Sequence, residues 1–162
     1  MEIKEVHGVG YERLKNILKD LHGYEARVGW FENSKYEDGT QVAMVAAQNE
    51  FGNANKRIPA RPFMRPTIIE KQNEWAVLAE KGAKQILLGN QNLENVFNLL
   101  GLKAVGDIKR TISKIFTPPL AAATIAARLE KRKNNTTVGN LFKPLIDTGI
   151  MLNSLISVVE RT

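Results

Sequence analysis

The residues that could carry chemistry are few, and their spacing does not assemble an active site. Asp147, Thr148 and Gly149 form the triplet found in aspartic proteases, which need two carboxylates that share one site. The triplet occurs once in this chain and precedes a helix-then-strand pattern. We therefore expect it to cap a local turn rather than to activate water.

Metal and nucleotide chemistry also lack the necessary groups. His7 and His22 have no acidic or histidine neighbour at metal-ligand spacing, and the chain has no cysteine to supply a thiolate. Gly8 and Gly10 do not have the glycine spacing of a phosphate-binding loop. The sequence therefore predicts no enzyme activity and no cofactor. The enzyme alternative would require an acid-base or nucleophile pair that the residues do not display.

Two basic segments are better candidates for binding. The chain carries 23 Lys and Arg against 17 Asp and Glu, and its formal net charge of +6 favours an anionic partner such as nucleic acid or an acidic protein surface. One basic segment ends an alanine-rich helical pattern, where cations also complement the helix dipole. Its candidate contacts to DNA phosphates or to an acidic partner are Arg128, Lys131, Arg132 and Lys133. The alternative is an ordinary solvated helix end.

The other basic segment is an extended arm at about residues 53–66. Three prolines fix φ within it and lower the entropic cost of ordering it. They are Pro59, Pro62 and Pro66. If exposed, Phe63 and Met64 would anchor a partner; if buried, they would fasten the arm to its own domain. The residues alone leave both alternatives open.

The elements that must position these residues follow from hydrophobic spacing. The length suits a single domain, residues 1–162. An amphipathic helix is predicted over 11–21, and a strand with one apolar side near 24–31. Weak alternation at the start of the chain predicts a short N-terminal strand over 1–6, and the end of the chain predicts a closing strand near 154–161.

Helical spacing accounts for most of the remaining residues. One helix is predicted with Thr40 as its N-cap and Gly52 as its stop, and a long helical hairpin is predicted at about 67–116. A further helix would have Thr117 as its cap and Pro118 in its first turn. The fold class is therefore α+β, a small antiparallel sheet packed with several α-helices that include the long central hairpin.

Nothing in the sequence indicates export or membrane insertion. The opening stretch, MEIKEVHGVG, interleaves charges with its few apolar residues, unlike a signal peptide. No run approaches about 18 uninterrupted apolar residues. We therefore expect a soluble protein, cytoplasmic where it is made, with no membrane partner.

Three segments together resemble a known family, the tail-completion or neck proteins of tailed bacteriophages and prophages, also called the phage virion morphogenesis or minor tail family. They are residues 28–52, residues 57–66, and residues 117–132 followed by 143–159, and they occur in the family's order. The stretch between Lys71 and Lys103 carries no family signature. The matching motif residues are Asn49, Glu50, Phe51, Gly52, Pro118, Pro119, Leu120, Pro144, Leu145, Asp147, Thr148 and Gly149.

The resemblance implies structural work and no catalysis. Proteins of this family join finished heads and tails, typically as rings at the neck through which the genome passes. The implied partners are copies of the chain in a ring, head-side connector or portal-adaptor proteins, tail terminator or tail tube proteins, and, non-specifically, the passing genomic DNA. The implied location is the neck or head-proximal end of the tail in the virion, after assembly in the host cytoplasm.

A ring subunit needs a surface that binds a different surface of its neighbour, and the arm would supply it. In this interpretation Phe63 anchors the arm on the adjacent subunit, while Arg61 and Arg65 pair with carboxylates at the rim. The alternative is that Phe63 packs inside its own chain. The predicted inter-subunit arm comprises Arg57, Ile58, Pro59, Arg61, Pro62, Phe63 and Arg65. The alternative function is a small basic module that binds DNA non-specifically.

Overall fold

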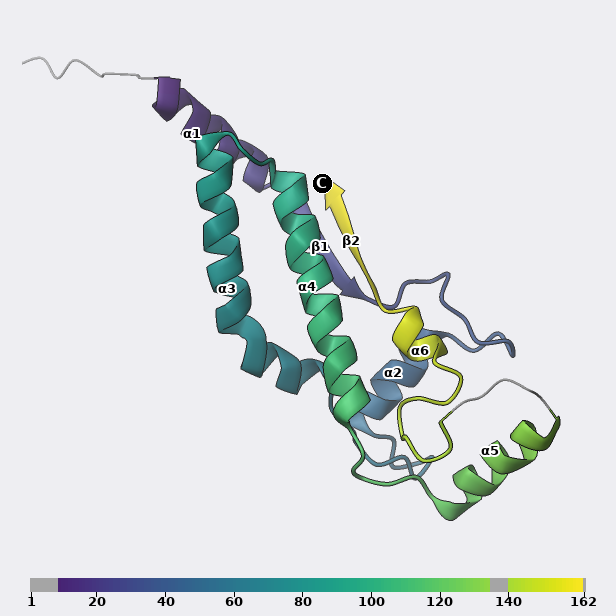
Figure 1. Cartoon of the computed structure of the whole chain (residues 1–162). Coiled ribbons are helices and arrows are strands. Elements are labelled where there is room, and N and C mark those ends of the chain that lie inside the picture. Colours follow the sequence, from purple (N-terminus) through teal and green to yellow (C-terminus); the bar gives the residue numbers. More distant parts are fainter. Residues whose placement is uncertain (1–8, 135–139, 162) are drawn as a thin grey trace, which may run out of the picture.

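The computed structural model describes residues 9–134 and 140–161 and has an α+β fold. A two-stranded antiparallel sheet, made by one strand near each end of the chain, packs against helices that include a long hairpin (Figure 1). The fold class predicted from the sequence is therefore confirmed. The strand predicted over 1–6 lies outside the described residues.

The sheet pairs β1 (Tyr24–Gly29) with β2 (Ile156–Arg161), in a register that places Tyr24 opposite Arg161. Both strands lie close to the bounds that alternation predicted. One side of the sheet packs on the hairpin: Ser157 lies so close to Gly101 that a Cβ on that glycine would meet the serine Cβ at 2.7 Å. The glycine therefore allows the strand and the helix to approach each other.

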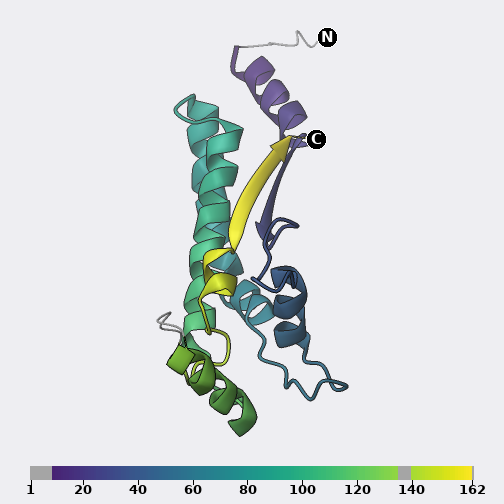
Figure 2. The same ribbon diagram turned by 90° about the vertical axis from the view of Figure 1, so that its right-hand side faces the viewer.

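The hairpin consists of α3 (Met64–Leu88) and α4 (Leu93–Lys114), which lie side by side with the sheet along α4 (Figures 1 and 2). Gly89 ends α3 with φ 83°, and the Asn92 side chain caps α4 by accepting a hydrogen bond from a backbone N–H. The predicted hairpin is thus confirmed. Its first helix begins at Met64, before the predicted residue 67.

A buried carboxylate ties the two helices of the hairpin together. Asp107 accepts hydrogen bonds from Trp75 Nε1 at 2.9 Å and Arg110 Nη1 at 2.9 Å, and it pairs with Lys103. Burial opposes the charged form, but the hydrogen bonds from Lys103 and Trp75 outweigh it and hold the pKa of Asp107 below its ordinary value. The ionised carboxylate therefore fixes α3 against α4.

The other helices match the sequence predictions with two exceptions. They are α1 (Val9–Leu21), α2 (Val42–Phe51), α5 (Ala122–Asn134) and α6 (Ile150–Asn153). Thr40 is not the cap of α2: the N-cap is Gln41, and the Thr40 backbone N–H instead donates to Asp38 Oδ1 in a turn. The helix predicted from Thr117 begins at Ala122, because Pro119 disfavours the helical conformation of the residue before it.

The core lies where α2, the start of α3, the second half of α4 and α6 meet. Phe63 is fully buried there, and Trp30 packs edge-on against its ring with the centroids 5.7 Å apart. The Trp30 Nε1–H donates to the Met151 carbonyl at 2.7 Å. The other buried apolar residues of this cluster are Val42, Ala46, Val105, Ile108, Ile112, Leu145, Met151 and Leu155.

Candidate functional site: the arm junction

The segments that carry the family resemblance meet at one place, which we call the arm junction: residues 49–66, 118–120 and 140–149, together with Arg128. Glu50 is its central acid. Its Oε2 accepts hydrogen bonds from the backbone N–H groups of Phe63 at 2.6 Å and Met64 at 2.9 Å. Its Oε1 accepts from the backbone N–H and the Nε of Arg65. A side chain at the end of α2 therefore caps the start of α3.

The cap explains why α3 begins earlier than the sequence predicted. The first turn of a helix has backbone N–H groups with no partner inside the helix, and a carboxylate satisfies them and complements the helix dipole. Burial opposes ionisation of Glu50, but the hydrogen bonds from Phe63, Met64 and Arg65 outweigh it and hold its pKa below the ordinary value. Glu50 is therefore a structural anion at neutral pH.

Arg61 binds the arm to the segment before α5. Its Nε donates to the Pro118 carbonyl at 2.7 Å and its Nη2 to the Pro119 carbonyl at 2.8 Å, while its backbone N–H donates to the Asn49 carbonyl. The side chain is buried, and this burial, with the nearby charge of Arg128, lowers its pKa. Arg61 pairs with carbonyls of its own chain, so the expectation that it meets carboxylates on a neighbour is corrected.

Phe63 likewise belongs to the interior of its own chain. Its exposed fraction is 0%, so the ring is not available to anchor the arm on an adjacent subunit. The aromatic ring fills the core beside Trp30, which is the alternative that the sequence left open. Arg65 is more than half exposed, and it pairs with Glu50 Oε1 at 3.0 Å and lies over the Phe51 ring. The arm is thus fastened at its second half.

The first half of the arm forms a tight exposed turn. Asn53 and Ile58 exchange backbone hydrogen bonds of 2.8 and 2.9 Å, and Arg57 lies between them with φ 52°. Gly52 approaches the next segment closely, since a Cβ on it would meet the Ala60 nitrogen at 2.9 Å. Arg57 is exposed, as are Pro59 and Pro62, whereas Ile58 is half-buried.

Arg128 is not a surface contact for phosphates, contrary to the sequence prediction. Its side chain is only 10% exposed and its Nε lies 3.3 Å from Asp147 Oδ1. Its Nη1 donates to the carbonyls of Asn140 at 2.7 Å and Lys143 at 2.8 Å. The sequence predicted a surface position for the guanidinium because Arg128 belongs to a basic helix end. In the structure the guanidinium instead donates hydrogen bonds to backbone carbonyls of the loop that follows α5. Arg128 therefore holds α5 to residues 140–147.

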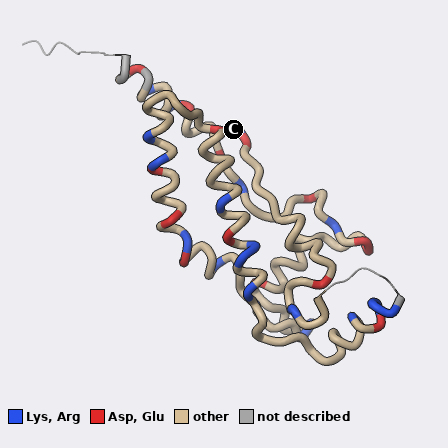
Figure 3. Tube along the Cα trace, in the orientation of Figure 1, with Lys and Arg blue, Asp and Glu red and all other residues tan. Residues whose placement is uncertain are grey.

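The remaining basic residues of α5 are where the sequence placed them. Lys131, Arg132 and Lys133 are exposed at the end of the helix, which is blue in Figure 3. Lys133 pairs with Glu130 at 2.8 Å on the helix surface. These three side chains stay candidates for contact with phosphates or with an acidic protein.

A hollow of about 350 Å³ lies at the centre of the arm junction. Arg61 and Arg128 both line it, and both are bonded to backbone carbonyls. Asp147 contributes its carboxylate to Arg128, and Thr148 Oγ1 accepts a hydrogen bond from the Ile150 N–H at 3.4 Å, just before α6, whose N-cap is Gly149. Other motif residues in its wall are Asn49, Leu120, Pro144, Leu145 and Gly149.

The polar groups of this site are already engaged with one another. Among the residues that the structure describes, no buried side-chain nitrogen or oxygen lacks a hydrogen-bond partner. Over the same residues, no group of three or more His, Cys, Asp and Glu side chains is placed to hold a metal ion. The arrangement is suited to holding segments together.

Sequence reasoning missed the roles of Glu50, Arg128 and Asp107. A signal existed for Asp107, since it is an acid directly beside apolar residues of the helical stripe that contains Ala104 and Ile108. For Glu50 and Arg128 the hydrogen-bond partners lie 12 or more residues away in the chain, and no local pattern predicts them.

No helix among the described residues is long and apolar enough to cross a membrane. Comparisons with protein-family models, with curated proteins and with solved structures found no match to this chain. The functional proposal therefore depends on the sequence resemblance and on the arm junction.

Proposed function

We propose that this chain is a structural virion protein of a tailed phage or prophage, a tail-completion or neck ring subunit that joins the head connector to the tail around the DNA passage. The observation that carries the proposal is the arm junction. The segments that resemble the family are far apart in the sequence, and Glu50, Arg61 and Arg128 bind them to one another. Motifs that serve one structural unit are expected to converge in this way.

The junction supports an architectural role because it fixes the direction of exposed segments. Within the junction, backbone hydrogen bonds between Asn53 and Ile58 close the exposed turn after Gly52, and Phe51 beside this turn is 67% exposed. Since Phe63 and Arg61 are used internally, we propose that the contact to a neighbour is made by this exposed turn and by Phe51. An exposed aromatic beside a fixed turn has the properties of an interface anchor.

The shape of the molecule suits a contact between unlike surfaces. α1 and α5 lie at opposite ends of an elongated body (Figures 1 and 2). A ring forms when one surface of a subunit binds a different surface of the next and the rotation closes. In this proposal copies of the chain form the ring, its two sides meet the connector and tail proteins, and the DNA passes through without sequence recognition.

Negative-stain electron microscopy of the purified full-length chain tests the proposal. We expect closed rings of uniform diameter, alone or on connector or tail rings isolated from the same phage. Phe51→Ala should remove the rings and leave the circular dichroism spectrum and the melting temperature unchanged, because the ring of Phe51 is mostly exposed. Absence of rings in both samples would contradict the proposal.

The second candidate is a small basic module that binds DNA non-specifically. It is favoured by the exposed Lys131, Arg132 and Lys133 at the end of α5. Binding of a fluorescent DNA duplex should then weaken steeply with salt, and a triple Lys/Arg→Glu variant at these positions should lose it. Binding with no salt dependence, or binding that survives the triple variant, would exclude this candidate.

A further inference from the structure

The sheet is narrower than the helical layer that it covers. Neighbouring strands lie about 4.8 Å apart and packed helices about 8–10 Å apart, so two strands cover about one helix. Both β1 and β2 pack on α4. Within the described residues, 9–134 and 140–161, neither strand packs closely on α3. The side of α3 that faces the sheet layer is therefore left open beside β1.

An apolar groove of about 510 Å³ occupies this position. Ala26 and Val28 of β1 line this groove. It is also lined by Ile68, Trp75 and Ala76 of α3 and by Ala104 of α4. No charged residue and no residue of β2 contributes to its lining. The groove consequently lies on the β1 side of the sheet and has no group that would bind a charged ligand.

The groove continues along α3 towards α1. A second apolar groove of about 480 Å³ shares Ala79 and Leu100 with the first and reaches Leu87 near the end of α3. The other wall of this second groove is α1, with Leu14, Ile17, Leu18 and Leu21. The groove beside β1 therefore follows α3 from Met64 to Ala79, which is about 22 Å at a rise of 1.5 Å per residue, and a strand of about seven residues has this length.

The edge of β1 beside the groove determines what kind of segment fits. β1 pairs with β2 only, so alternate residues of β1 direct their backbone N–H and C=O groups away from β2 with no strand opposite them among the described residues. An extended segment would satisfy these groups and place every second side chain in the groove. A helix in the groove would fill the apolar space and leave the edge unpaired.

We propose that β1 accepts a strand from a partner protein, an extended segment with small or medium apolar side chains at alternate positions, which extends the sheet over α3. A second copy whose α4 lay on this same face of the sheet does not fit as the donor, because that helix would occupy the place where α3 lies. Three irregular segments among the described residues contain prolines, which cannot donate to a ladder, and the segment between β1 and α2 is closed on itself by the bridge between Lys35 and Gln41. The prolines are Pro59, Pro62, Pro118, Pro119 and Pro144.

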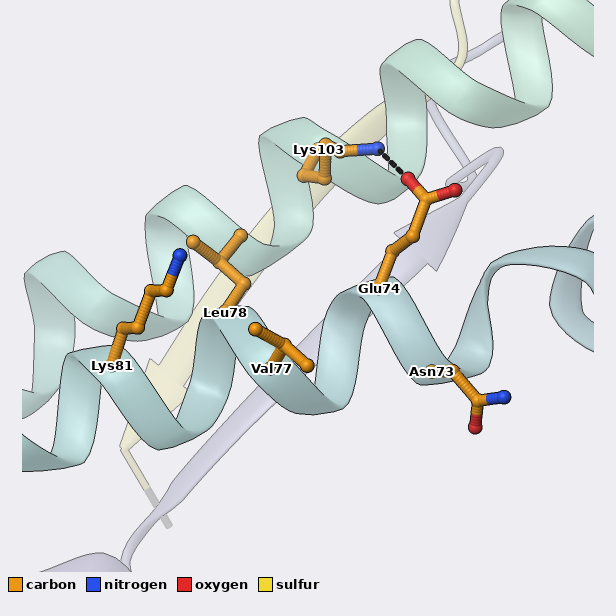
Figure 4. A pocket seen from close by; sticks show the side chains of 6 residues that line it. All are labelled: Asn73, Glu74, Val77, Leu78, Lys81 and Lys103. Atoms are coloured by element: carbon orange, nitrogen blue, oxygen red, sulfur yellow. Dashed lines mark hydrogen bonds and ion pairs between the residues drawn. The ribbon is translucent and has the colours of Figure 1, made fainter.

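This inference goes beyond the proposed function and does not require a ring. Figure 4 shows the opposite face of the hairpin, with the strands behind the helices, where Val77 and Leu78 lie beside the ion pair of Lys103 and Glu74. That face has no strand edge next to it in the figure. It supplies a matched control, because Val77 and Ala76 are neighbours in α3 and line opposite faces.

The test is a full-length chain that carries a tethered strand after its C-terminus. A Gly/Ser linker of about fifteen residues would be followed by the probe, Thr-Val-Lys-Val-Thr-Val-Lys-Val; at this length the tether gives a millimolar effective concentration. The control probe replaces each Val by Ser. We expect the Val probe to slow amide hydrogen exchange at alternate residues of β1 by about tenfold or more and to raise the melting temperature. The Ser probe should do neither.

Groove variants locate the effect. Ala76→Arg should abolish the protection of β1 by the tethered Val probe, while Val77→Arg should leave it intact. Both side chains are exposed, so the fold should survive, and Ile68→Lys is the second groove variant if circular dichroism shows that Ala76→Arg is unfolded. The proposal is overturned if the tethered Val probe leaves exchange in β1 unchanged, or if its effect persists in a folded groove variant.

Discussion

The arm junction and the α1 end of the hairpin hold their side chains in different ways. At the junction, Glu50, Arg61 and Arg128 are buried or nearly so and are bonded to backbone groups of three separate segments. At the other end, Leu14 is 40% and Leu18 52% exposed, and both line an apolar groove. We call this second region the apolar end: Leu14–Leu21 of α1, Ala79–Leu87 of α3 and Leu93–Leu100 of α4.

The difference separates the residues that make the fold from the residues that are available to partners. Buried charges are costly unless they are fully bonded, so Glu50, Arg61 and Arg128 tolerate few changes and are not available for new contacts. Exposed apolar side chains have the opposite property, because covering them is favourable and the described residues leave them open to solvent. The sequence led us to expect that the arm contacts partners. In the structure, most of the exposed large apolar side chains instead belong to the hairpin and α1.

The largest expected effect is in the core of the junction. Phe63→Ala should cost about 3–5 kcal/mol of unfolding free energy, because the ring is fully buried and its removal leaves a cavity. Urea unfolding followed by circular dichroism measures this. Phe51→Ala is the matched control, and its cost should stay within about 0.5 kcal/mol because that ring is 67% exposed. A cost of Phe63→Ala as small as that of Phe51→Ala would show that the arm is not part of the core.

The next effect concerns the carboxylate that caps α3. Glu50→Gln should cost about 1–3 kcal/mol, since it removes the charge that accepts from the start of the helix. The pKa of Glu50 is lowered in the folded chain, so its contribution is fully present above the unfolded value near 4.5 and is lost as the pH falls through the folded pKa. The difference in unfolding free energy between wild type and Glu50→Gln, measured against pH, should therefore shrink in acid.

Glu37→Gln is the control for the titration of Glu50. Glu37 is an exposed acid in a turn, so replacing it should change the unfolding free energy by no more than about 0.5 kcal/mol. If the difference between wild type and Glu50→Gln stayed constant down to low pH, the carboxylate would not be the stabilising group.

A smaller and local effect is expected at α5. Arg128→Ala removes the donor to the carbonyls of Asn140 and Lys143, so α5 should lose its attachment at a cost of about 1–3 kcal/mol. Hydrogen exchange in residues 122–134 should speed up while exchange in α3 and α4 does not change. Lys131→Ala, at an exposed position of the same helix, should have no such effect. Uniform destabilisation of the whole chain would contradict the local role of Arg128.

The smallest effect on stability is expected at the apolar end. Leu18→Ser should change the unfolding free energy by no more than about 0.5 kcal/mol, because Leu18 is more than half exposed. The same substitution should weaken association with partners or with other copies, as measured by sedimentation velocity. A large loss of stability would show that α1 is packed in solution, and the comparison between the two regions would then fail.

The fold was largely predictable because local spacing determines it. Alternation placed both strands of the sheet within a few residues, and helical periodicity with Gly89 between two apolar stripes placed the hairpin. The contacts of the junction were not predictable, because Arg61 and Arg128 bind carbonyls whose positions depend on the folded loops. The basic character of both residues suggested an external partner, and their burial shows an internal one.

The central claim is that the chain is a structural subunit that assembles through protein surfaces. Static light scattering on a size-exclusion column, at two protein concentrations and at low and high salt, tests it most directly. We predict a discrete multimer whose mass is insensitive to salt, because exposed apolar surface and not charge would drive the assembly. A monomer under all four conditions, together with duplex DNA binding that weakens steeply with salt, would contradict the claim and favour the DNA-binding alternative.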